Sequence, residues 1–491
     1  MSFKRSIFQS VRAAGLSAFG TNFLLLLQWI VLARLLEPED FGLMSMLTVF
    51  LGFLSLLAEL GIPSAIIHRQ DINRETLATF YWVSWLLGAM VFSFVWVLAP
   101  VAVQLFGEPR LDRLIYWGSL VLLVVPIGQQ HQALMEKQLK FGELARIEVV
   151  SGGISLLVAV FSALLGYGAL SLVWGFLVNA LAKSILYFVV GWQFWRPSFV
   201  FLGSTLRRHL NFCLHYVGQR LVNYVQSNID FALIGTFIGA EALGAYTLAY
   251  NLANLPSSKI NAVFSRVFFP VLSSLQKDVA ALRKGYLQLQ EATSMVNIPF
   301  SVAMAAIAPI AIPLWFGHQW QTSVLLLQIL CVVGAGRAIS GTIGPLLLAS
   351  GRTDLGFRWS LLIVSLQVPG IYIGVISRSA VGVAIAFAVL QIVYVILNYM
   401  ILVRTLIGPC LGAYIAKMWP FVWMSAAMGG AMIVVANALH FSGDTVVFFS
   451  EIVIGASVYA GLMWLVKKPF LVELSALSLG KDLREYRATI A

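Results

Sequence analysis

Long apolar runs recur along almost the whole chain and are separated by short polar turns. A bilayer core is about 30 Å thick, and a helix needs about 20 mainly apolar residues to cross it. Strands of outer-membrane barrels alternate instead in segments of about ten residues. The pattern therefore predicts an all-α, polytopic membrane protein with about 14 transmembrane helices. We expect the spans at residues 13–33, 42–67, 77–100, 114–135, 147–165, 169–191, 211–238, 242–265, 290–316, 322–348, 356–376, 380–403, 414–439 and 446–466.

The composition excludes the common soluble classes. Of the 491 residues, 60% are apolar and 11% are charged, whereas an ordinary globular domain has about 25% charged residues. A cytosolic enzyme, a disordered protein and a nucleic-acid-binding protein are therefore excluded. The net charge of +11 does not indicate a nucleic-acid partner, because the basic residues are spread over short loops and form no single patch.

The three cysteines, Cys213, Cys331 and Cys410, have no metal-like spacing. An odd number of irregularly spaced cysteines is typical of buried small apolar side chains, and not of a disulfide framework or a zinc site. We therefore expect no metal site and no cofactor.

The distribution of Lys and Arg predicts the orientation of the chain in the membrane. Cytoplasmic loops of membrane proteins carry an excess of these residues. If the N-terminus lies inside, the inner loops and tails, counted together with Arg358 and Lys417 at the inner ends of their spans, hold 24 of the 32 basic residues, and the outer loops hold 4. One missed span would invert this asymmetry for every later loop. We therefore expect both termini to be cytoplasmic, with short outer loops and no extramembrane domain that carries chemistry.

Two short motifs recur at nearly the same separation. The stretch LLEPEDFGLMSML aligns with FIGAEALGAYTLA at an offset of 202 residues, with Gly42 on Gly244. A second match, at an offset of 211 residues, relates the turn at 166–170 to the turn at 377–381. Copies of six helices keep the same orientation, because six is an even number. We therefore predict an N-lobe of helices 1–6 at residues 1–195, a C-lobe of helices 7–12 at 196–405, two further helices at 406–466, and a cytoplasmic C-terminal tail at 467–491.

Polar residues inside the seventh and eighth spans fall on single helix faces. In the seventh span, Arg220, Asn223, Ser227 and Asp230 lie at i, i+3, i+7 and i+10, within an arc of about 80°. Such faces are unusual in helices that contact lipid on all sides. The eighth span carries a second polar face, formed by Tyr246, Tyr250, Asn254, Ser257 and Asn261.

The repeat relates these faces to the first two spans. An offset of 202 residues places Gln28 on Asp230 and Glu59 on Asn261. Exposed polar side chains are costly in lipid, so we expect equivalent faces of the two lobes to line a shared hydrated cavity. Ser, Thr and Asn side chains can instead serve only as hydrogen-bond partners between membrane helices, and this alternative stays open for these faces.

Ionisable residues at membrane depth mark functional positions. Four basic residues fall well inside spans: Lys183, Arg220, Lys259 and Arg337. Lys183 lies about two turns from the inner end of its helix, from where its ammonium group can snorkel to the interface, so it is left out of the predicted site. Around the helix axis, Lys259 is expected to lie away from the polar face of its span, although the nearby Pro256 can bend the helix there.

The chain resembles a known group of transporters in two stretches, ARLLEPEDFG near the start and SNIDFALIGTFIGAEALGAYTLAYNLANLPSSKINAVFSRVFFPVLSSLQ from Ser227. Both are similar to the polysaccharide-repeat-unit (lipid-linked oligosaccharide) flippases of the multidrug/oligosaccharidyl-lipid/polysaccharide superfamily, nearest to the colanic-acid-type exporters. The resemblance covers nearly the whole chain. It implies a bacterial inner-membrane protein that moves undecaprenyl-pyrophosphate-linked oligosaccharide from the cytoplasmic to the periplasmic leaflet. It also implies alternating access of two lobes around a cationic cavity, with a proton or sodium ion and the polysaccharide polymerase machinery as candidate partners.

The predicted site follows from the chemistry of such a substrate. A pyrophosphate in a low-dielectric cavity needs positive charge, and an arginine can donate two parallel hydrogen bonds to it. Sugars need amide and hydroxyl partners and aromatic rings. Acidic groups at depth could bind a coupling cation or hold the arginines in place. We expect Arg220, Arg337, Lys259, Asn223, Tyr250, Asn254, Asn261 and Gln28 to bind substrate, and Asp230 and Glu59 to couple transport to an ion.

Two other classes are compatible with a polytopic chain. An ion-coupled multidrug or small-molecule antiporter of the same superfamily would have fewer spans and a cavity of net negative charge, whereas four basic and two acidic residues lie at depth here. A membrane enzyme such as an O-antigen polymerase or ligase would carry a large periplasmic loop with catalytic Arg or His, and no such loop is predicted. We therefore expect a transporter and not an enzyme.

Overall fold

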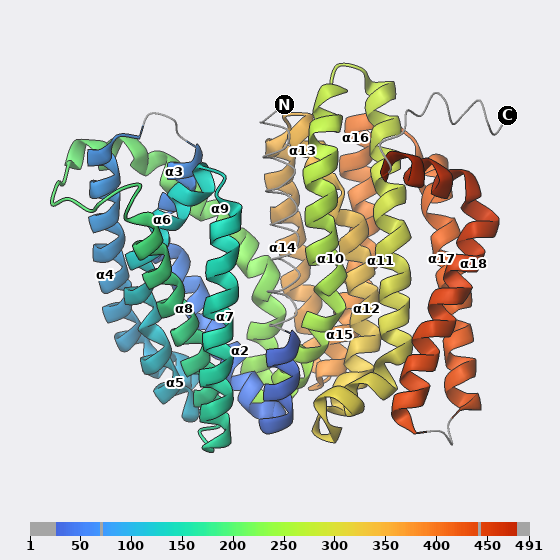
Figure 1. Ribbon diagram of the computed structural model, residues 1–491, viewed down its shortest axis with the longest axis horizontal. Coiled ribbons are helices and arrows are strands. Elements are labelled where there is room, and N and C mark those ends of the chain that lie inside the picture. Colours follow the sequence, from blue (N-terminus) through green and yellow to red (C-terminus); the bar gives the residue numbers. More distant parts are fainter. Residues whose placement is uncertain (1–25, 69–71, 440–442, 479–491) are drawn as a thin grey trace. The chain divides into compact units, whose positions relative to one another are not determined.

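The computed structural model describes residues 26–68, 72–439 and 443–478, apart from some side chains within the helices. Helices make up nearly all of this part of the chain, and it contains no strand (Figure 1). In lipid, helices satisfy their backbone hydrogen bonds within one segment. The prediction of an all-α, polytopic membrane protein is confirmed.

The internal contacts divide the chain into two compact units. The first unit contains the residues up to Thr247 together with Ser360–Val383. A helix at Leu26–Leu35 stands at its start. The further helices of this unit are α2 (Pro38–Glu59), α3 (Ile62–His68), α4 (Arg74–Phe106), α5 (Arg110–Ser119), α6 (Val121–Lys137), α7 (Phe141–Leu164), α8 (Ala169–Gly191), α9 (Gly203–Phe237), the first turns of α10 (Ala240–Ser274) and most of α14 (Thr353–Ile376).

The second unit contains Leu248–Trp359 and the residues from Ala384 onward. The predicted lobes were defined by a repeat in the sequence, whereas these two units are defined by internal contacts. The division into units does not test the repeat, so the lobes stay a prediction. Besides the rest of α10, the helices of the second unit are α11 (Val279–Phe316), the 3₁₀-helix His318–Trp320, α12 (Thr322–Gly341), α13 (Ile343–Ala349), most of α15 (Ala380–Leu397), the π-helix Asn398–Val403, α16 (Arg404–Ile407), α17 (Leu411–Ala438) and α18 (Asp444–Ser478).

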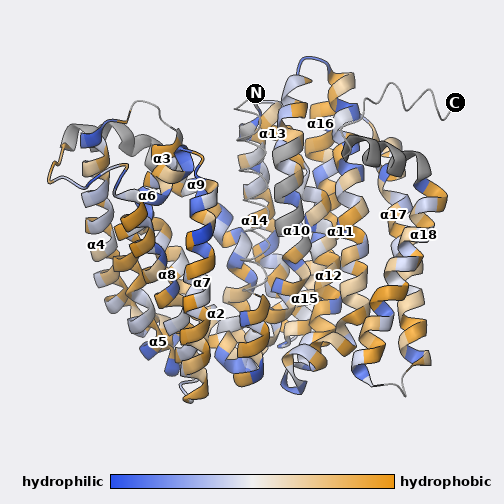
Figure 2. Ribbon diagram, viewed as in Figure 1, coloured by the Kyte–Doolittle hydropathy of each residue, from blue (hydrophilic) through white to orange (hydrophobic). Residues whose placement is uncertain are grey.

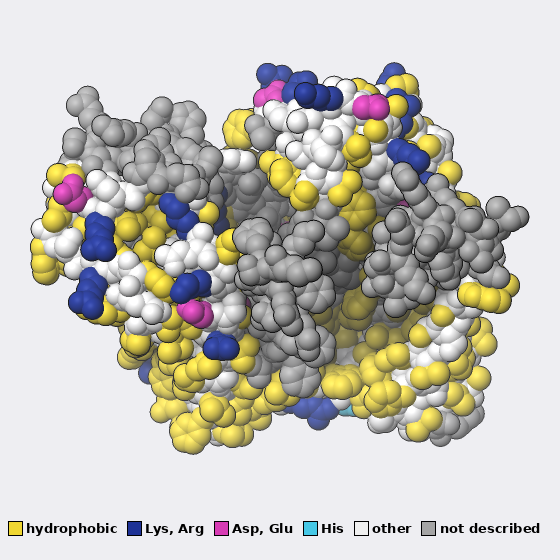
Figure 3. Space-filling view, turned by 45° about the horizontal axis from the view of Figure 1, so that its top comes forward, with side chains coloured by type: hydrophobic (Ala, Val, Ile, Leu, Met, Phe, Trp, Pro, Cys, Tyr) yellow, Lys and Arg dark blue, Asp and Glu magenta, His cyan; other side chains and the backbone are white. Residues whose placement is uncertain are grey.

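Eleven helical segments of the described part are long and apolar enough to cross a membrane, and they coincide with eleven of the fourteen predicted spans. The predicted spans 211–238 and 242–265 lie in α9 and α10, and the span 13–33 lies only partly within the described residues. The total of fourteen therefore stays a prediction. Hydrophobic residues run along the helices of both units (Figure 2), and broad hydrophobic areas cover the face shown in Figure 3, as contact with lipid requires.

The predicted span at 42–67 is divided into two helices. α2 ends at Glu59, and α3 begins after a two-residue break. Leu60 and Gly61 have φ angles of 46° and 65°, a left-handed conformation that terminates a right-handed helix and that glycine adopts at little cost. Apolar composition alone could not reveal this break. Shorter interruptions separate α5 from α6 and α12 from α13.

Polar caps fix the ends of two of the longest helices. The side-chain oxygen of Asn73 accepts a hydrogen bond from the backbone N–H of Thr76 at 2.8 Å and caps α4. Gly107 ends the same helix at a φ of 66°. Asp278 caps α11 by accepting from two backbone N–H groups. These caps provide partners for backbone groups that a helix end leaves unpaired.

Candidate functional site

An ion pair joins two helices of the first unit within the predicted membrane region. Arg220 of α9 donates a hydrogen bond from Nη1 to Oε2 of Glu59, the last residue of α2, at 3.1 Å. The two side chains are 46% and 31% exposed, so water or a ligand can reach them. Opposite charges in contact are less costly inside a membrane than either charge alone. The sequence predicts both residues as site residues, and the structure brings them together.

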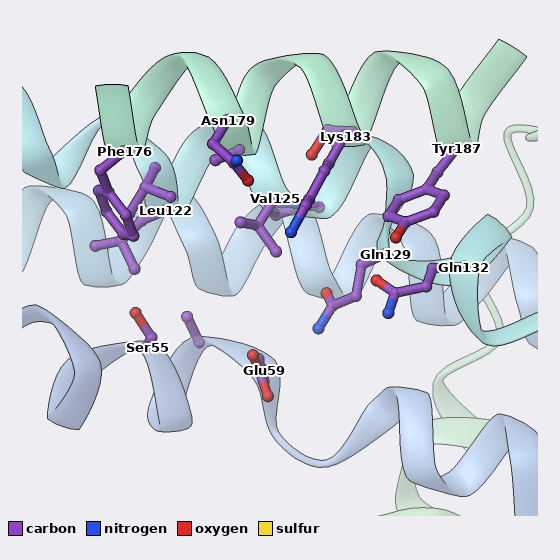
Figure 4. A pocket seen from close by; sticks show the side chains of 15 residues that line it. Ser55, Glu59, Leu122, Val125, Gln129, Gln132, Phe176, Asn179, Lys183 and Tyr187 are labelled. Carbon is purple, nitrogen blue, oxygen red and sulfur yellow. The ribbon is translucent and has the colours of Figure 1, made fainter. Parts of the chain in front are cut away.

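A pocket of about 300 Å³ lies beside Glu59 in the same unit. Residues of α2, α6 and α8 form its walls (Figure 4). Figure 4 shows the side chain of Lys183 extending from α8 toward the space between α8 and α2. Leu122, Val125 and Phe176 supply apolar surface. The polar lining comes from all three helices and consists of Ser55, Glu59, Gln129, Gln132, Asn179, Lys183, Ser184 and Tyr187.

This pocket was not predicted from the sequence, although shared polar faces of α8 and α6 indicate it. Asn179, Lys183 and Tyr187 are spaced i, i+4 and i+8, so they share one face of α8. Gln129 and Gln132 share a face of α6 at i and i+3. The sequence alone favours snorkelling for Lys183, whereas the structure places its side chain on the pocket wall. Faces of this kind are informative only once the neighbouring helices are known.

Asp230 is the buried acid of α9, with an exposed fraction of 0%. Its Oδ2 accepts a hydrogen bond from the hydroxyl group of Tyr246, on the first turns of α10, at 2.7 Å. The rings of Phe231 and Tyr246 are in edge-to-face contact beside it. Burial of a carboxyl group without a hydrogen bond would be costly. Tyr246 therefore stabilises Asp230 in a buried position between the two helices.

Arg337 of α12 is the centre of a second group, in the second unit. Its guanidinium donates hydrogen bonds to the hydroxyl of Tyr250 and, at 3.3 Å, to Oδ1 of Asn254, both on α10. The same guanidinium lies 5.1 Å from the centroid of the Tyr250 ring and 5.1 Å from that of Phe387. Hydroxyl, amide and aromatic partners orient a guanidinium without neutralising it. The structure brings the predicted residues Tyr250, Asn254 and Arg337 together.

Asn261 has a different setting on the same helix. Its amide nitrogen donates to the backbone oxygen of Ala338 at 3.1 Å, and its oxygen accepts from Asn297 at 3.3 Å. These bonds connect α10 to α12 and α11, which is the role of an interhelical hydrogen-bond partner. The side chain of Lys259 lies outside the described residues.

Gln28 and Asn223 complete the predicted set. Gln28 is half-buried in the helix Leu26–Leu35, and Asn223 is exposed on α9. Neither is in hydrogen-bond contact with another predicted site residue in the described part of the chain. The structure thus forms two groups from the predicted residues, Glu59 with Arg220 and Tyr250 with Asn254 and Arg337.

The chain is similar in sequence to proteins that are named for polysaccharide biosynthesis. The chain matches the model of a family described as polysaccharide biosynthesis protein over residues 31–325. The lipopolysaccharide biosynthesis protein WzxC of Escherichia coli (strain K12) is 31% identical over 417 residues, which are 84% of this chain and 85% of WzxC. The teichuronic acid biosynthesis protein TuaB of Bacillus subtilis (strain 168) is 31% identical over 471 residues, which are 94% of this chain and 95% of TuaB.

Solved structures with a similar fold are also membrane proteins. The lipid II flippase MurJ in an inward closed conformation has a TM-score of 0.78 at 15% identity, and the match covers 93% of this chain and 99% of MurJ. An inward-facing multidrug resistance transporter of the MATE family has a TM-score of 0.58 at 16% identity, covering 77% of this chain and 93% of the transporter. At these identities the likeness shows a shared polytopic helical fold.

Proposed function

The chain belongs to the polysaccharide biosynthesis protein family, and we propose that it is a flippase for lipid-linked oligosaccharide repeat units. The relatives that match most of the chain are named for the biosynthesis of lipopolysaccharide and teichuronic acid. MurJ, which shares the fold, is named a lipid II flippase. The proposed substrate is an undecaprenyl-pyrophosphate-linked oligosaccharide that passes from the cytoplasmic to the periplasmic leaflet of a bacterial inner membrane. Both termini are then cytoplasmic, in agreement with the distribution of basic residues.

The observation that carries the proposal is the setting of Arg337. A pyrophosphate has closely spaced anionic oxygens, and a guanidinium fork matches two of them at once. Tyr250 and Asn254 orient the guanidinium through neutral groups. Tyr250 also offers a ring face and Asn254 an amide, which suit the sugars next to the pyrophosphate. Arg337 is therefore our proposed headgroup ligand.

Arg220 and Glu59 have a role that depends on their contact. Because Arg220 already has an acidic partner at 3.1 Å, a pyrophosphate would bind it in competition with Glu59. Release from Arg220 would leave Glu59 with an unpaired charge at depth, and such a charge favours uptake of a proton or a sodium ion. The pair thus supplies a physical link between substrate binding and ion coupling. Asp230 is the second proposed coupling residue, and Gln28, Asn223, Lys259 and Asn261 are proposed to contact the sugars.

Transport then proceeds by alternating access of the two lobes, without a catalytic step. Binding of the headgroup stabilises one state of the protein more than the other, and this difference shifts the population between the states. The polysaccharide polymerase machinery would take up the repeat unit after transfer. Ion-coupled export of drugs or other small molecules is the second candidate, since a multidrug transporter shares the fold with a TM-score of 0.58.

The test is transport by purified protein in proteoliposomes that contain lipid-linked oligosaccharide from the native host. Arg337→Ala should abolish transfer between leaflets, and Arg337→Lys should retain part of it, because lysine keeps the charge but loses the fork. Arg352→Ala is a matched control, since Arg352 lies outside the predicted spans and pairs with Asp354. Full transfer by Arg337→Ala would contradict the proposed headgroup site. Drug efflux without transfer of the lipid by wild-type protein would favour the second candidate.

A further inference from the structure

The pocket between α2, α6 and α8 contains one positively charged side chain among the described residues that line it. Its lining includes one acidic residue, Glu59, and one basic residue, Lys183. Glu59 is occupied by Arg220 at 3.1 Å. Among the described residues, Lys183 has neither a hydrogen-bond nor an ion-pair partner. An ammonium at membrane depth is costly unless water or an anion meets it, so the pocket favours an anionic ligand.

Neutral polar groups surround this ammonium (Figure 4). Gln129 and Asn179 have carboxamides without a hydrogen-bond partner in the described part of the chain. Gln132 donates one hydrogen bond, to Glu136 at 2.9 Å, and keeps its oxygen as an acceptor. Carboxamides both donate and accept hydrogen bonds, which matches the hydroxyl groups of a sugar. The volume of about 300 Å³ lies at the lower end of the range of small-molecule sites, about 300–1,000 Å³, and suits one sugar ring.

We propose that this pocket binds an acidic sugar of the repeat unit, with the ammonium of Lys183 facing the sugar's carboxylate. The amides of Gln129 and Asn179 then bind the ring hydroxyls, and Phe176 supplies apolar surface for the ring. The inference rests on the proposed function, because it assigns part of the same substrate to a separate pocket. Lys183 would select substrates by their charge and would not hold the lipid anchor.

The pyrophosphate of the lipid carrier fits this pocket less well. It has more than one negative charge, and bidentate arginine is the better partner for it. Among the described residues, the lining of the pocket has one lysine and no arginine. Three carboxamides beside a single cation are better matched to a group with one charge and several hydroxyls. A uronic acid has this chemistry.

The binding test uses full-length protein in nanodiscs and saturation-transfer NMR with three probes: methyl glucuronide, methyl glucoside and inorganic pyrophosphate. We expect the wild type to bind methyl glucuronide about tenfold more tightly than methyl glucoside, the effect of one charge-assisted hydrogen bond. Lys183→Met should remove this preference and Lys183→Arg should retain it. Lys277→Met is the control, since Lys277 is exposed and does not line the pocket.

Three results would overturn the proposal: equal affinity of the wild type for the two glycosides, an unchanged preference in Lys183→Met, or stronger binding of pyrophosphate in competition with the glucuronide. If Lys183→Met does not fold, Asn179→Leu takes its place. Asn179→Leu removes a carboxamide that is proposed to bind the ring hydroxyls and leaves the charge of Lys183 in place. It should therefore weaken binding of both glycosides to the same extent. Unchanged binding of both glycosides to Asn179→Leu would contradict the proposed pocket.

A second experiment in cells separates this inference from the proposed function. Lys183→Met should reduce the export of a repeat unit that contains a uronic acid and should leave export of a neutral repeat unit unchanged. Equal loss of both would show a structural role for Lys183 and overturn the inference. If the wild type exports neither repeat unit, the proposed function fails, and the glycoside preference in nanodiscs still decides whether the pocket recognises acidic sugars.

Discussion

Ser45 and Thr247 share a hydrogen bond of 2.9 Å between their hydroxyl groups and lie 202 residues apart in the chain. This separation is the offset that relates the two copies of the repeated motif. Each hydroxyl also lies within hydrogen-bond distance of a backbone oxygen of its own helix, that of Phe41 for Ser45 and that of Leu243 for Thr247. Phe41 and Leu243 are themselves an equivalent pair, and the hydroxyl that does not donate across the contact can donate to its own backbone oxygen. The start of α2 and the start of α10 thus meet through equivalent positions of the repeated motif.

A disulfide can test whether this contact opens during transport. Two hydroxyl oxygens at 2.9 Å place the side chains close enough for cysteines to bridge. We expect the double variant Ser45→Cys/Thr247→Cys to form a disulfide on oxidation, to lose export and to regain it on reduction. Non-reducing gels of proteolysed membranes measure the bridge, and each single variant is the control. Normal export by fully oxidised protein would show that the contact stays closed throughout the cycle.

Two glycines permit the close approach of these helices. A Cβ at Gly42 would overlap the backbone oxygen of Ala240, and a Cβ at Gly244 would overlap that of Pro38. Backbone atoms cannot move aside as a flexible side chain can, so overpacking should cost about 1–3 kcal/mol. We predict a lower unfolding midpoint for Gly42→Ala and Gly244→Ala, measured by circular dichroism in detergent.

The matched control is Gly152→Ala in α7, where an added Cβ would meet no atom within 4 Å. Alanine is the better helix former by about 0.5–1 kcal/mol, so this variant should be neutral or more stable. A midpoint for Gly42→Ala as high as that for Gly152→Ala would mean that the α2–α10 contact separates without cost.

The buried carboxylate of Glu291 connects three helices of the second unit. Glu291 of α11 is 3% exposed and pairs with Lys417 of α17 and, at 2.7 Å, with Lys467 of α18. Removing one partner of a buried ion pair costs about 3–5 kcal/mol, because the other charge is left unpaired. We therefore predict that Glu291→Gln strongly lowers the unfolding midpoint and that Lys417→Met has a smaller effect, since one lysine remains.

Glu143→Gln is a suitable comparison for this change. Glu143 is 39% exposed and lies 3.8 Å from Lys140, and exposed pairs contribute about 0–1 kcal/mol. Its unfolding midpoint should stay close to that of the wild type. An equal effect of Glu143→Gln and Glu291→Gln would show that the Glu291 group contributes no more than a surface pair.

The sequence predicted the spans well because the cost of polar groups in lipid constrains composition along each helix. Eleven predicted spans coincide with helices of the described part. The break at Leu60 and Gly61 was missed because it depends on backbone conformation in two residues, and an apolar run carries no information about this. Glu291 was missed because it lies at the edge of a predicted span, where an acid needs no buried partner.

The candidate site was predictable as polar faces but not as pairs. Arg220 and Glu59 each follow from helical spacing, yet their contact depends on how α2 and α9 pack. The Asp230–Tyr246 bond spans two consecutive helices, and their predicted polar faces included both residues. Lys183 was set aside because snorkelling depends on what lies beside a lysine, and the neighbouring pocket appears only in three dimensions.

Asp230 gives the last prediction, which concerns coupling to an ion gradient. Its carboxyl group is fully buried and accepts a hydrogen bond from Tyr246 at 2.7 Å. The predicted repeat aligns Asp230 with Gln28, which is uncharged, so the predicted repeat does not require an acid at this position. Because Asp230 is a buried acid at a position where the predicted repeat needs none, it is a candidate for taking up a proton or a sodium ion during the transport cycle.

Asp230→Asn separates coupling from structure, because asparagine is nearly isosteric and its side-chain oxygen can still accept the hydrogen bond from Tyr246. We expect the variant to fold, to bind lipid-linked substrate, and to lose the dependence of its export rate on external pH or sodium. Tyr246→Phe is the companion variant: it removes the hydrogen bond and leaves the carboxylate, so it should shift the pH dependence without abolishing it. Export rates measured over a range of external pH and sodium concentrations decide the question. If Asp230→Asn exports at the wild-type rate with the wild-type dependence on both ions, Asp230 serves only to hold α9 and α10 together, and coupling must reside elsewhere.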